Sequence, residues 1–391
     1  MGVILLLKFI NFIIISVFIS KSFFNKKFFH KLLTKISSMR MVSILGSGPA
    51  GLSAAINLAR EGFQISVYEK NKDVGQRFNG DFQGLENWTV NEDVHQSFKK
   101  MNINQGYDYV PFKSFTLSNG DRFWNFQLDK TAFYLVKRGP QEGSLDYGLK
   151  EQALDMGVDI NFGETIPGES TDIIATGPIV REKFAVARGA VFETDMDDMA
   201  MALVNDHLAY KGYSYLLVNG GYGTISTVLF HDFHLLKDCF QNTLKIFREL
   251  TDFTWANIHH SGGMGSFSNQ NTFERNGRLY VGEAAGIQDL LWGFGIRDAI
   301  TSGFLAAKAL IHNEDYSELA EQQFRKKLKS SIVNRFLWEI SGNYSWIVDR
   351  IYGQNDPLAY VGSFHRFNWM QRLLYPLARL AMKRRYVNLR L

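Results

Sequence analysis

The stretch VSILGSGPAGLSAAINLAREGFQISVYEKN, residues 42–71, decides the fold. Residues 42–45 form a short apolar, partly β-branched run that is typical of a buried parallel strand, and the run ends directly at Gly46. Gly46 permits a tight turn, and Gly48 lets the main chain approach a pyrophosphate without a Cβ in the way. Gly51 allows the following helix to pack closely on the strand. This spacing predicts a dinucleotide-binding turn.

The residues that follow complete a βαβ unit. The apolar periodicity predicts a helix over 49–60, with Pro49 in its first turn, and then a second strand over 64–68. Glu69 ends that strand 18 residues after Gly51, near the offset of about 20 at which an acid accepts hydrogen bonds from an adenosine ribose. Its carboxylate disfavours the 2′-phosphate of NADP. NAD and FAD both remain open on these residues alone.

A second glycine-rich stretch, RLYVGEAAGIQDLLWGFGIRDAITSGFLAA, spans residues 278–307. It predicts a short strand over 279–281 and a helix over 296–307 that opens after Gly293 and Gly295. The stretch resembles the Gly-Asp motif of the FAD-dependent hydroxylase and geranylgeranyl reductase superfamily. In that family the acid binds the ribityl chain, and the glycines place a helix N-terminus against the flavin ring. A helix start carries partial positive charge, which favours the anionic reduced flavin.

Weaker matches lie around these two motifs. Glu283 stands where the superfamily usually has Asp, and its longer side chain can still reach a ribityl hydroxyl. Residues 134–163 resemble the family's Arg…Leu-Asp…Leu segment, residues 172–177 resemble a strand and turn close to the cofactor, and Arg77 sits where relatives carry a residue near the flavin. The resemblance covers about residues 41–310 and implies FAD as the cofactor. The predicted FAD-binding residues are Gly46, Gly48, Pro49, Ala50, Gly51, Glu69, Lys70, Arg77, Arg138, Thr176, Gly177, Gly282, Glu283, Gly293, Gly295 and Ile296.

The resemblance implies an α/β fold. We expect a Rossmann-type FAD-binding domain with three layers around a parallel sheet, an inserted β-sheet substrate domain and a helical C-terminal region. The predicted boundaries are 1–40 for an N-terminal tail, 41–180 and 269–315 for the two parts of the FAD-binding domain, 181–268 for the insertion that covers the flavin, and 316–391 for the helical region.

Composition excludes several classes of protein. A single cysteine, Cys239, rules out an intramolecular disulfide and cysteine-rich metal sites, and we predict no metal site. The net charge of +4 comes from residues 1–40, which hold seven Lys or Arg and no acid. The other 36 basic and 39 acidic residues give about −3, which offers no support for nucleic-acid binding.

Both ends of the chain raise the question of a membrane. Residues 3–19 approach the length of a membrane span but include Lys8, and the lysines that follow would keep the folded domain on the cytoplasmic side. The alternative is that translation starts at Met39 or Met41. After Asp356 there are seven basic residues and no acids, so the last helix could lie on an anionic membrane surface or pack on its own domain. We expect a cytoplasmic protein and leave association with the membrane face open.

The insertion is expected to contact the substrate. Residues 212–224 predict a strand and a turn, and they resemble the Tyr-x-Trp-x-Phe-Pro…Gly-x-Gly segment of geranylgeranyl reductases. Tyr213 matches the family's Tyr, whereas Tyr215 replaces the Trp. Tyr213, Tyr215 and His259 are weak catalytic candidates, and none takes a firm role.

Together these features predict an FAD-dependent oxidoreductase that reduces C=C bonds of an apolar isoprenoid or lipid by hydride transfer from the flavin N5. No second Gly-x-Gly-x-x-Gly follows a strand, which argues against a dedicated NAD domain. The reductant is therefore NAD(P)H that binds transiently, or a protein donor such as ferredoxin. Two alternatives stay open: an FAD-dependent aromatic monooxygenase, and a non-catalytic FAD-binding redox module.

Overall fold

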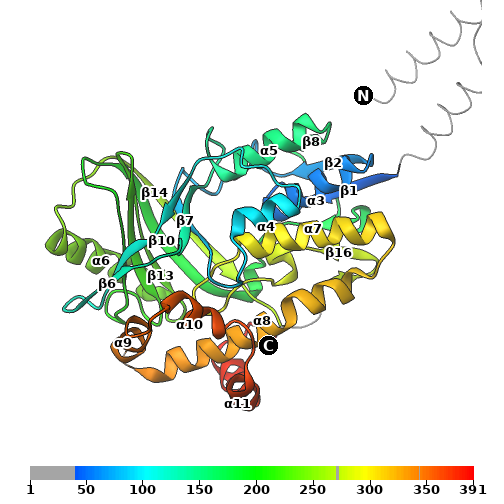
Figure 1. The fold of residues 1–391 in the computed structure, drawn as a ribbon. Coiled ribbons are helices and arrows are strands. Elements are labelled where there is room, and N and C mark those ends of the chain that lie inside the picture. The colour runs from blue at the N-terminus through cyan, green and yellow to red at the C-terminus, as the bar shows by residue number, and fades with distance from the viewer. Residues whose placement is uncertain (1–39, 270–272, 343) are drawn as a thin grey trace, which may run out of the picture. The chain divides into compact units, whose positions relative to one another are not determined.

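The computed structural model describes residues 40–269, 273–342 and 344–391 (Figure 1). Apart from Arg40, the predicted N-terminal tail lies outside these residues, so its two interpretations stay predictions. Residues 41–391 form one unit.

The first motif folds as its sequence predicts. Strand β1 (Met41–Leu45) leads into helix α3 (Pro49–Arg60) and then into strand β2 (Gln64–Glu69), which pairs with β1 in parallel. Gly46 has a φ of +106°, a conformation that glycine adopts without strain. A Cβ on Gly51 would lie 2.1 Å from the Gly46 carbonyl oxygen, so the close packing of turn and helix requires glycine there.

The sheet that contains this unit has the strand order β15-β16-β9-β1-β2-β8. Its other strands are β8 (Asp159–Phe162), β9 (Ile173–Ile174), β15 (Glu274–Arg275) and β16 (Arg278–Tyr280). The prediction of a parallel sheet is wrong at one edge, where β15 pairs with β16 in antiparallel fashion and makes the sheet mixed. The cause is the two-residue connection Asn276-Gly277. Both residues have positive φ, which is the geometry of a tight hairpin turn.

Helices α3, α5 (Leu145–Asp155) and α7 (Ile296–His312) lie side by side in the parallel-sheet part of the structure (Figure 1). The contact between α3 and α7 is very close, because a Cβ on Gly303 would lie 2.0 Å from the carbonyl oxygen of Ala50. The two glycine-rich stretches, more than 200 residues apart in the sequence, therefore meet in one packed layer.

A second sheet has the strand order β14-β10-β13-β12-β11-β5-β6. Its strands are β5 (Ser114–Ser118), β6 (Phe123–Gln127), β10 (Lys183–Glu193), β11 (Met199–Leu203), β12 (Tyr213–Asn219), β13 (Tyr222–Leu229) and β14 (Ala256–Ser266). Helix α6 (Leu236–Leu250) packs on one face of this sheet. Strands β5 and β6 belong to this second sheet, although they lie within residues 41–180, which the sequence assigned to the FAD-binding domain.

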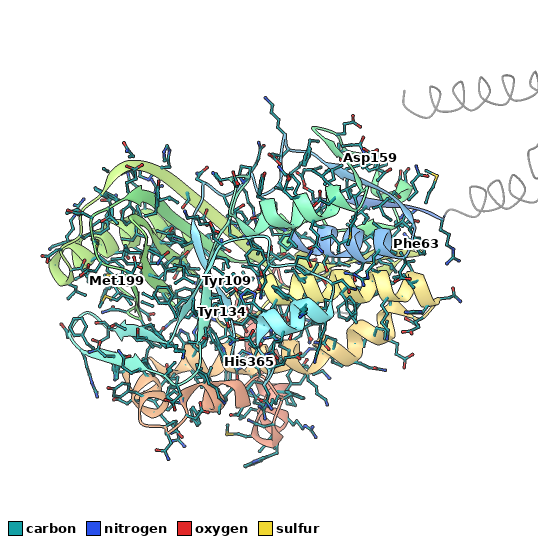
Figure 2. All side chains as sticks on the ribbon, turned by 45° about the horizontal axis from the view of Figure 1, so that its top comes forward. Phe63, Tyr109, Tyr134, Asp159, Met199 and His365 are labelled. Atoms are coloured by element: carbon teal, nitrogen blue, oxygen red, sulfur yellow. The ribbon has the colours of Figure 1, made fainter. Side chains whose placement is uncertain are left out.

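A small sheet joins the two larger ones. It consists of β3 (Phe82–Glu86), β7 (Phe133–Lys137) and β4 (Tyr109–Phe112), and helix α4 (Val94–Lys100) follows β3. The rings of Tyr109 and Tyr134 lie 5.6 Å apart near the middle of the unit (Figure 2). The Phe82 amide donates to the Thr224 hydroxyl at 2.8 Å, which ties the small sheet to β13.

The C-terminal region is helical, as predicted. It contains α8 (Tyr316–Ser341), α9 (Ser345–Tyr352), α10 (Pro357–Ser363) and α11 (Trp369–Arg385). Short 3-10 turns elsewhere span Gly168–Ser170, Val180–Glu182, Phe233–Leu235 and Gly282–Ala285. Across the described residues, we find no helix with the length and apolar character needed to cross a bilayer.

Candidate functional site

Four predicted motifs line one edge of the mixed sheet. Gly46 follows β1, Glu69 ends β2, Gly177 comes shortly after β9, and Gly282 comes two residues after β16. These four strands are neighbours and run in parallel, so their carboxyl ends lie at the same edge. Ligands of open α/β sheets bind at this edge.

The glycines at this edge divide into two groups. Gly46 and Gly295 are packed, because a Cβ would lie 2.3 Å from the Ala175 carbonyl oxygen and 2.2 Å from the Gln288 amide oxygen, respectively. The other group faces open space, since a Cβ would meet no atom within 4 Å. This group consists of Gly48, Gly177 and Gly293. A phosphate chain can therefore approach the backbone at Gly48.

Two helices begin at this edge without a side-chain cap. Gly48 is the N-cap of α3, with Pro49 in the first turn, and Gly295 is the N-cap of α7, whose first residue is Ile296. Uncapped helix starts present N–H groups and partial positive charge, which suit a diphosphate or an anionic ring. A Cβ on Gly282 would lie 3.1 Å from the Ala50 methyl group, so the turn after β16 packs against the start of α3.

Glu69 is buried and fixed by its neighbours. One carboxylate oxygen accepts from the amide and the hydroxyl of Ser47, both at 3.0 Å. The other accepts from the Asn71 amide at 2.9 Å and from its side chain at 2.6 Å. Sequence reasoning missed Ser47 and Asn71, although Ser47 stands inside the glycine motif and Asn71 only two residues after the acid. The adjacent Lys70 is exposed.

Glu283 connects the two halves of the site. Arg77 approaches it at 3.5 Å between guanidinium and carboxylate, so the loop after β2 meets the turn after β16. Its other oxygen accepts from the Ser266 amide and from the Gln288 side chain, both at 3.3 Å. The Arg77 side chain is 47% exposed whereas that of Glu283 is 13% exposed, which leaves the arginine room to move toward a ligand.

Arg138 holds a buried ion pair with Asp146 at 2.8 and 2.9 Å. The Asp146 carboxylate also accepts a hydrogen bond from the Gly139 amide at 3.0 Å, so the ion pair stabilises the turn before α5. Nearby, burial raises the pKa of the Asp81 carboxyl despite the charge of Arg138. The geometry gives Arg138 a structural role, and its predicted contact with the cofactor stays a prediction.

The weak catalytic candidates differ in their surroundings. The Tyr213 hydroxyl donates to the Trp292 carbonyl at 2.5 Å, directly before Gly293. Burial raises the pKa of both Tyr213 and Tyr215, so both phenols stay protonated around neutral pH. His259 lies exposed on the edge strand β14, and the predicted cofactor residue Thr176 is also exposed.

The face of the seven-stranded sheet opposite α6 is rich in apolar groups. Along β12, Leu216 and Val218 pack toward α6, so Tyr215 and Leu217 point to the other face. There they join a cluster that we call the apolar wall. Its buried members are Phe82, Phe112, Leu135, Ala200 and Leu217, and its partly buried members are Val110, Phe115, Phe133 and Tyr215.

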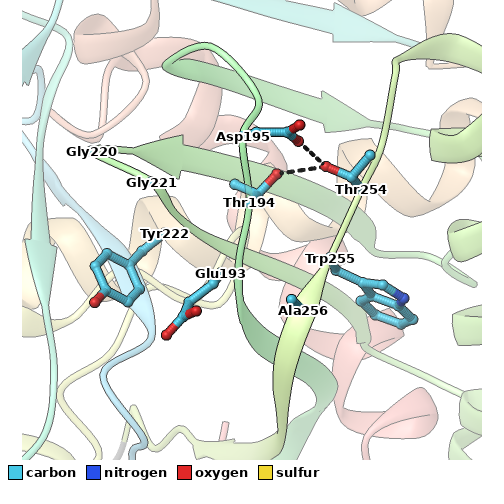
Figure 3. Close-up of a pocket in the computed structure, with 9 residues that line it drawn as sticks. All are labelled: Glu193, Thr194, Asp195, Gly220, Gly221, Tyr222, Thr254, Trp255 and Ala256. Carbon is cyan, nitrogen blue, oxygen red and sulfur yellow. Dashed lines mark hydrogen bonds between the residues drawn. The ribbon is translucent and has the colours of Figure 1, made fainter.

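An open hollow of about 620 Å³ lies elsewhere, at the β12–β13 turn (Figure 3). In this hollow the Thr254 hydroxyl donates to Asp195 and lies 3.2 Å from the Thr194 hydroxyl. The lining residues are Glu193, Thr194, Asp195, Gly220, Gly221, Tyr222, Thr254, Trp255 and Ala256. It contains none of the predicted cofactor residues, and we assign it no part in the candidate site.

Comparison with known proteins supports a nucleotide-binding edge. Residues 44–92 match the model of the NAD(P)-binding Rossmann-like domain. An all-trans-zeta-carotene desaturase of Myxococcus xanthus is 32% identical over 124 residues, which cover 27% of this chain. The match spans only 23% of the desaturase, less than a quarter of its length.

Solved structures match over almost the whole chain. A geranylgeranyl bacteriochlorophyll reductase-like protein from Thermoplasma acidophilum has a TM-score of 0.60 and 16% identity, covering 90% of this chain and 98% of that protein. A triple mutant of a flavin-dependent brominase also has a TM-score of 0.60, with 15% identity and coverage of 88% and 99%. The chain therefore has the fold of the FAD-dependent oxidoreductases, with the predicted second sheet and helical C-terminal region.

Proposed function

We propose that the protein is an FAD-dependent oxidoreductase that reduces C=C bonds of an apolar isoprenoid or lipid. One observation carries the proposal. Two remote glycine-rich turns lie at the same sheet edge, and the helices that follow them pack at the Gly303–Ala50 contact. A single dinucleotide can extend along such an edge.

The residues at the edge fit FAD. The open backbone at Gly48 and the start of α3 would bind the diphosphate. Glu69 would accept hydrogen bonds from the adenosine ribose in place of those from the Ser47 hydroxyl and the Asn71 side chain. Glu283 would accept from the ribityl chain. The start of α7 at Ile296 would face the ring, beside the open position at Gly293. When bound, FAD supplies hydride chemistry at its N5, and the protein supplies binding and orientation.

The apolar wall supports a hydrophobic substrate. Its rings stack closely, with Phe112 and Phe133 at 5.3 Å and an interplanar angle of 6°. Most of its side chains are buried, and the partly buried rings of Phe115, Phe133 and Tyr215 would border the path of a polyene or prenyl chain, which binds apolar rings without polar contacts. The partial match to a carotene desaturase and the overall similarity to a reductase-like protein named for geranylgeranyl bacteriochlorophyll favour the same substrate class.

The electron donor that we propose is NAD(P)H or a protein such as ferredoxin. The Rossmann-type match over residues 44–92 covers the part of the chain that would bind FAD. A transient donor therefore approaches the flavin from outside. The rival reaction is an oxygen-dependent hydroxylation, and the similarity of the fold to a flavin-dependent brominase does not decide between the two reactions.

Anaerobic turnover separates the reactions. The protein is loaded with FAD, reduced with dithionite, freed of excess reductant and mixed with a geranylgeranyl lipid or a carotene without oxygen. We expect flavin reoxidation together with a product that has gained two hydrogens. A product that appears only with oxygen and gains an oxygen atom would identify a monooxygenase. A second sample keeps its FAD oxidised. Bleaching of that flavin by substrate would show that the reaction runs as a desaturation, and a flavin that neither NAD(P)H nor reduced ferredoxin reduces would support a redox module.

A further inference from the structure

Helix α11 presents an apolar stripe to solvent. Trp369, Leu373, Leu377 and Leu380 are 78%, 74%, 57% and 51% exposed, respectively. At about 100° per residue these four positions fall within an arc of about 80° on the helix. Large apolar side chains of this kind are unusual as a contiguous exposed row, and such rows mark interaction surfaces.

The opposite side of α11 makes the contacts with the rest of the protein. Gln371, Ala378 and Met382 are buried there, and the Gln371 side chain donates to Asn334 at 2.7 Å. These positions lie about 180–220° around the helix from Trp369. The helix therefore packs on its own domain through this side, to which Met382 and the partly buried Leu374 add apolar contacts, while the four residues of the stripe stay exposed.

Basic residues border the stripe. Arg372, Arg379 and Lys383 are exposed and lie on its flank, about 280–320° around the helix, and the exposed Arg384 lies at its C-terminal end. In the described part of the chain, no Asp or Glu forms an ion pair with any of these four side chains. The sequence after Asp356 contains no acid at all. The surface therefore combines apolar and positive groups.

We propose that α11 binds the surface of an anionic lipid membrane, with the stripe inserted at the level of the lipid headgroups and the basic flank on the phosphates. This is the pattern of interfacial amphipathic helices. A second copy of the chain fits less well, because pairing two stripes would bring like-charged flanks together. The apolar segment over 3–19 fits less well for the same reason, since residues 1–40 carry seven basic residues and no acid.

This inference goes beyond the proposed reaction and does not require bound FAD. It also gives a physical route for an apolar substrate, which dissolves in membranes rather than in water. Elsewhere in the C-terminal region, Ile340 on α8 and Trp346 and Tyr352 on α9 are further exposed apolar groups.

The test uses the full chain with a fluorophore that reports the polarity around one residue. It is attached through Leu377→Cys in the stripe or through Leu154→Cys in α5, a control that is also exposed, at 43%. Cys239 is buried and burial raises the pKa of its thiol, so it reacts poorly with the label. Vesicles contain phosphatidylcholine alone or with phosphatidylglycerol as about a third of the lipid.

We expect a blue shift of the label at position 377 on vesicles with phosphatidylglycerol, a smaller shift on phosphatidylcholine, and none at position 154. The variant Leu373→Gln/Leu377→Gln/Leu380→Gln should bind anionic vesicles at least ~10-fold more weakly than the parent. Gln keeps the helix propensity of Leu, and an unchanged unfolding midpoint shows that the fold is intact. Leu154→Gln should bind as the parent does.

Three results would overturn the proposal. The full chain could bind vesicles while the label at 377 stays in water, which would place the contact elsewhere in the chain. The emission of the label at 377 could shift to the blue without lipid. A shift that grows with protein concentration would show that a second copy covers the stripe, and a shift at all concentrations would show that the same chain covers it. Finally, the triple variant could bind as tightly as the parent.

Discussion

Glu86 offers a quantitative test of the packing behind the candidate site. It is the last residue of β3 and is fully buried, and neither carboxylate oxygen has a hydrogen-bond partner among the described residues. The nearest cation is Lys327, at 3.7 Å, and that ammonium is held more closely by Asp298, at 2.6 Å. Burial, aided by the negative charge of Asp298, raises the pKa of Glu86 to about 7, although Lys327 and Arg297 act in the opposite direction.

The perturbation is Glu86→Gln, which keeps the shape of the neutral acid and removes its ionisation. A raised pKa in the folded state means that folding stability is complete below about pH 4.5 and falls as the pH rises through 7. One pKa unit corresponds to about 1.4 kcal/mol, so the difference between 4.5 and about 7 amounts to ~3 kcal/mol. Glu86→Gln should exceed the parent by less than about 1 kcal/mol at pH 5 and by ~3 kcal/mol at pH 8.

Urea unfolding of the full chain at both pH values measures this difference. The control is Glu61→Gln at an exposed position, which should change stability equally at pH 5 and pH 8. If Glu86→Gln is instead less stable than the parent at pH 8 by more than at pH 5, the carboxylate is ionised and stabilised by Lys327, and the reasoning from burial is wrong.

Three further predictions concern packing and polar contacts. Gly303→Ala should destabilise the fold by ~1–3 kcal/mol in urea unfolding, because the added methyl group meets the Ala50 carbonyl oxygen; equal stability would show that the helices separate easily. Arg138→Met should lower the free energy of unfolding by ~3–5 kcal/mol by leaving the Asp146 charge buried and unpaired, and adding Asp146→Leu should recover part of it. Tyr213→Phe should lower the free energy of unfolding by ~1 kcal/mol through loss of its hydrogen bond to the Trp292 carbonyl, and a change below the error of the measurement would contradict that bond.

The sequence predicted the parts of the fold that depend on local rules. The β1–α3–β2 unit follows from glycines, helical periodicity and a terminal acid within 30 residues, and each of these is a short-range constraint. The turn at Asn276-Gly277 is equally local, because Asn-Gly favours a tight hairpin turn, and this turn makes β15 antiparallel to β16.

Long-range pairing was less accessible from the sequence. Strand β5 pairs with β11 about 85 residues later, and no local signal identifies that partner. The periodicity of α11 likewise predicted an amphipathic helix, but not which side would pack. That choice depends on the partner surface around Asn334, which accepts the polar Gln371 instead of a leucine.

The predicted site residues show the same division. The predicted residues at or just after the ends of strands, such as Gly46, Glu69 and Glu283, lie together at the carboxyl edge because the strands that carry them run in parallel. The assignment of Arg138 to the cofactor site rests on the resemblance alone, and in the structure its side chain forms an ion pair with Asp146. Resemblance indicates that a residue matters without distinguishing a ligand contact from a structural one.

The most direct test of the central claim is an equilibrium titration of the protein with FAD, followed by flavin fluorescence. The test variant is Gly48→Ala, and the matched control is Gly168→Ala. A Cβ meets no atom within 4 Å at Gly48, and at Gly168, before β9 at the other edge of the sheet, it meets only the Ile174 side chain at 3.6 Å. We predict one FAD per chain, binding at least ~10-fold weaker for Gly48→Ala, and no change for Gly168→Ala. A protein that binds no FAD, or that binds it equally well in both variants, would contradict the account.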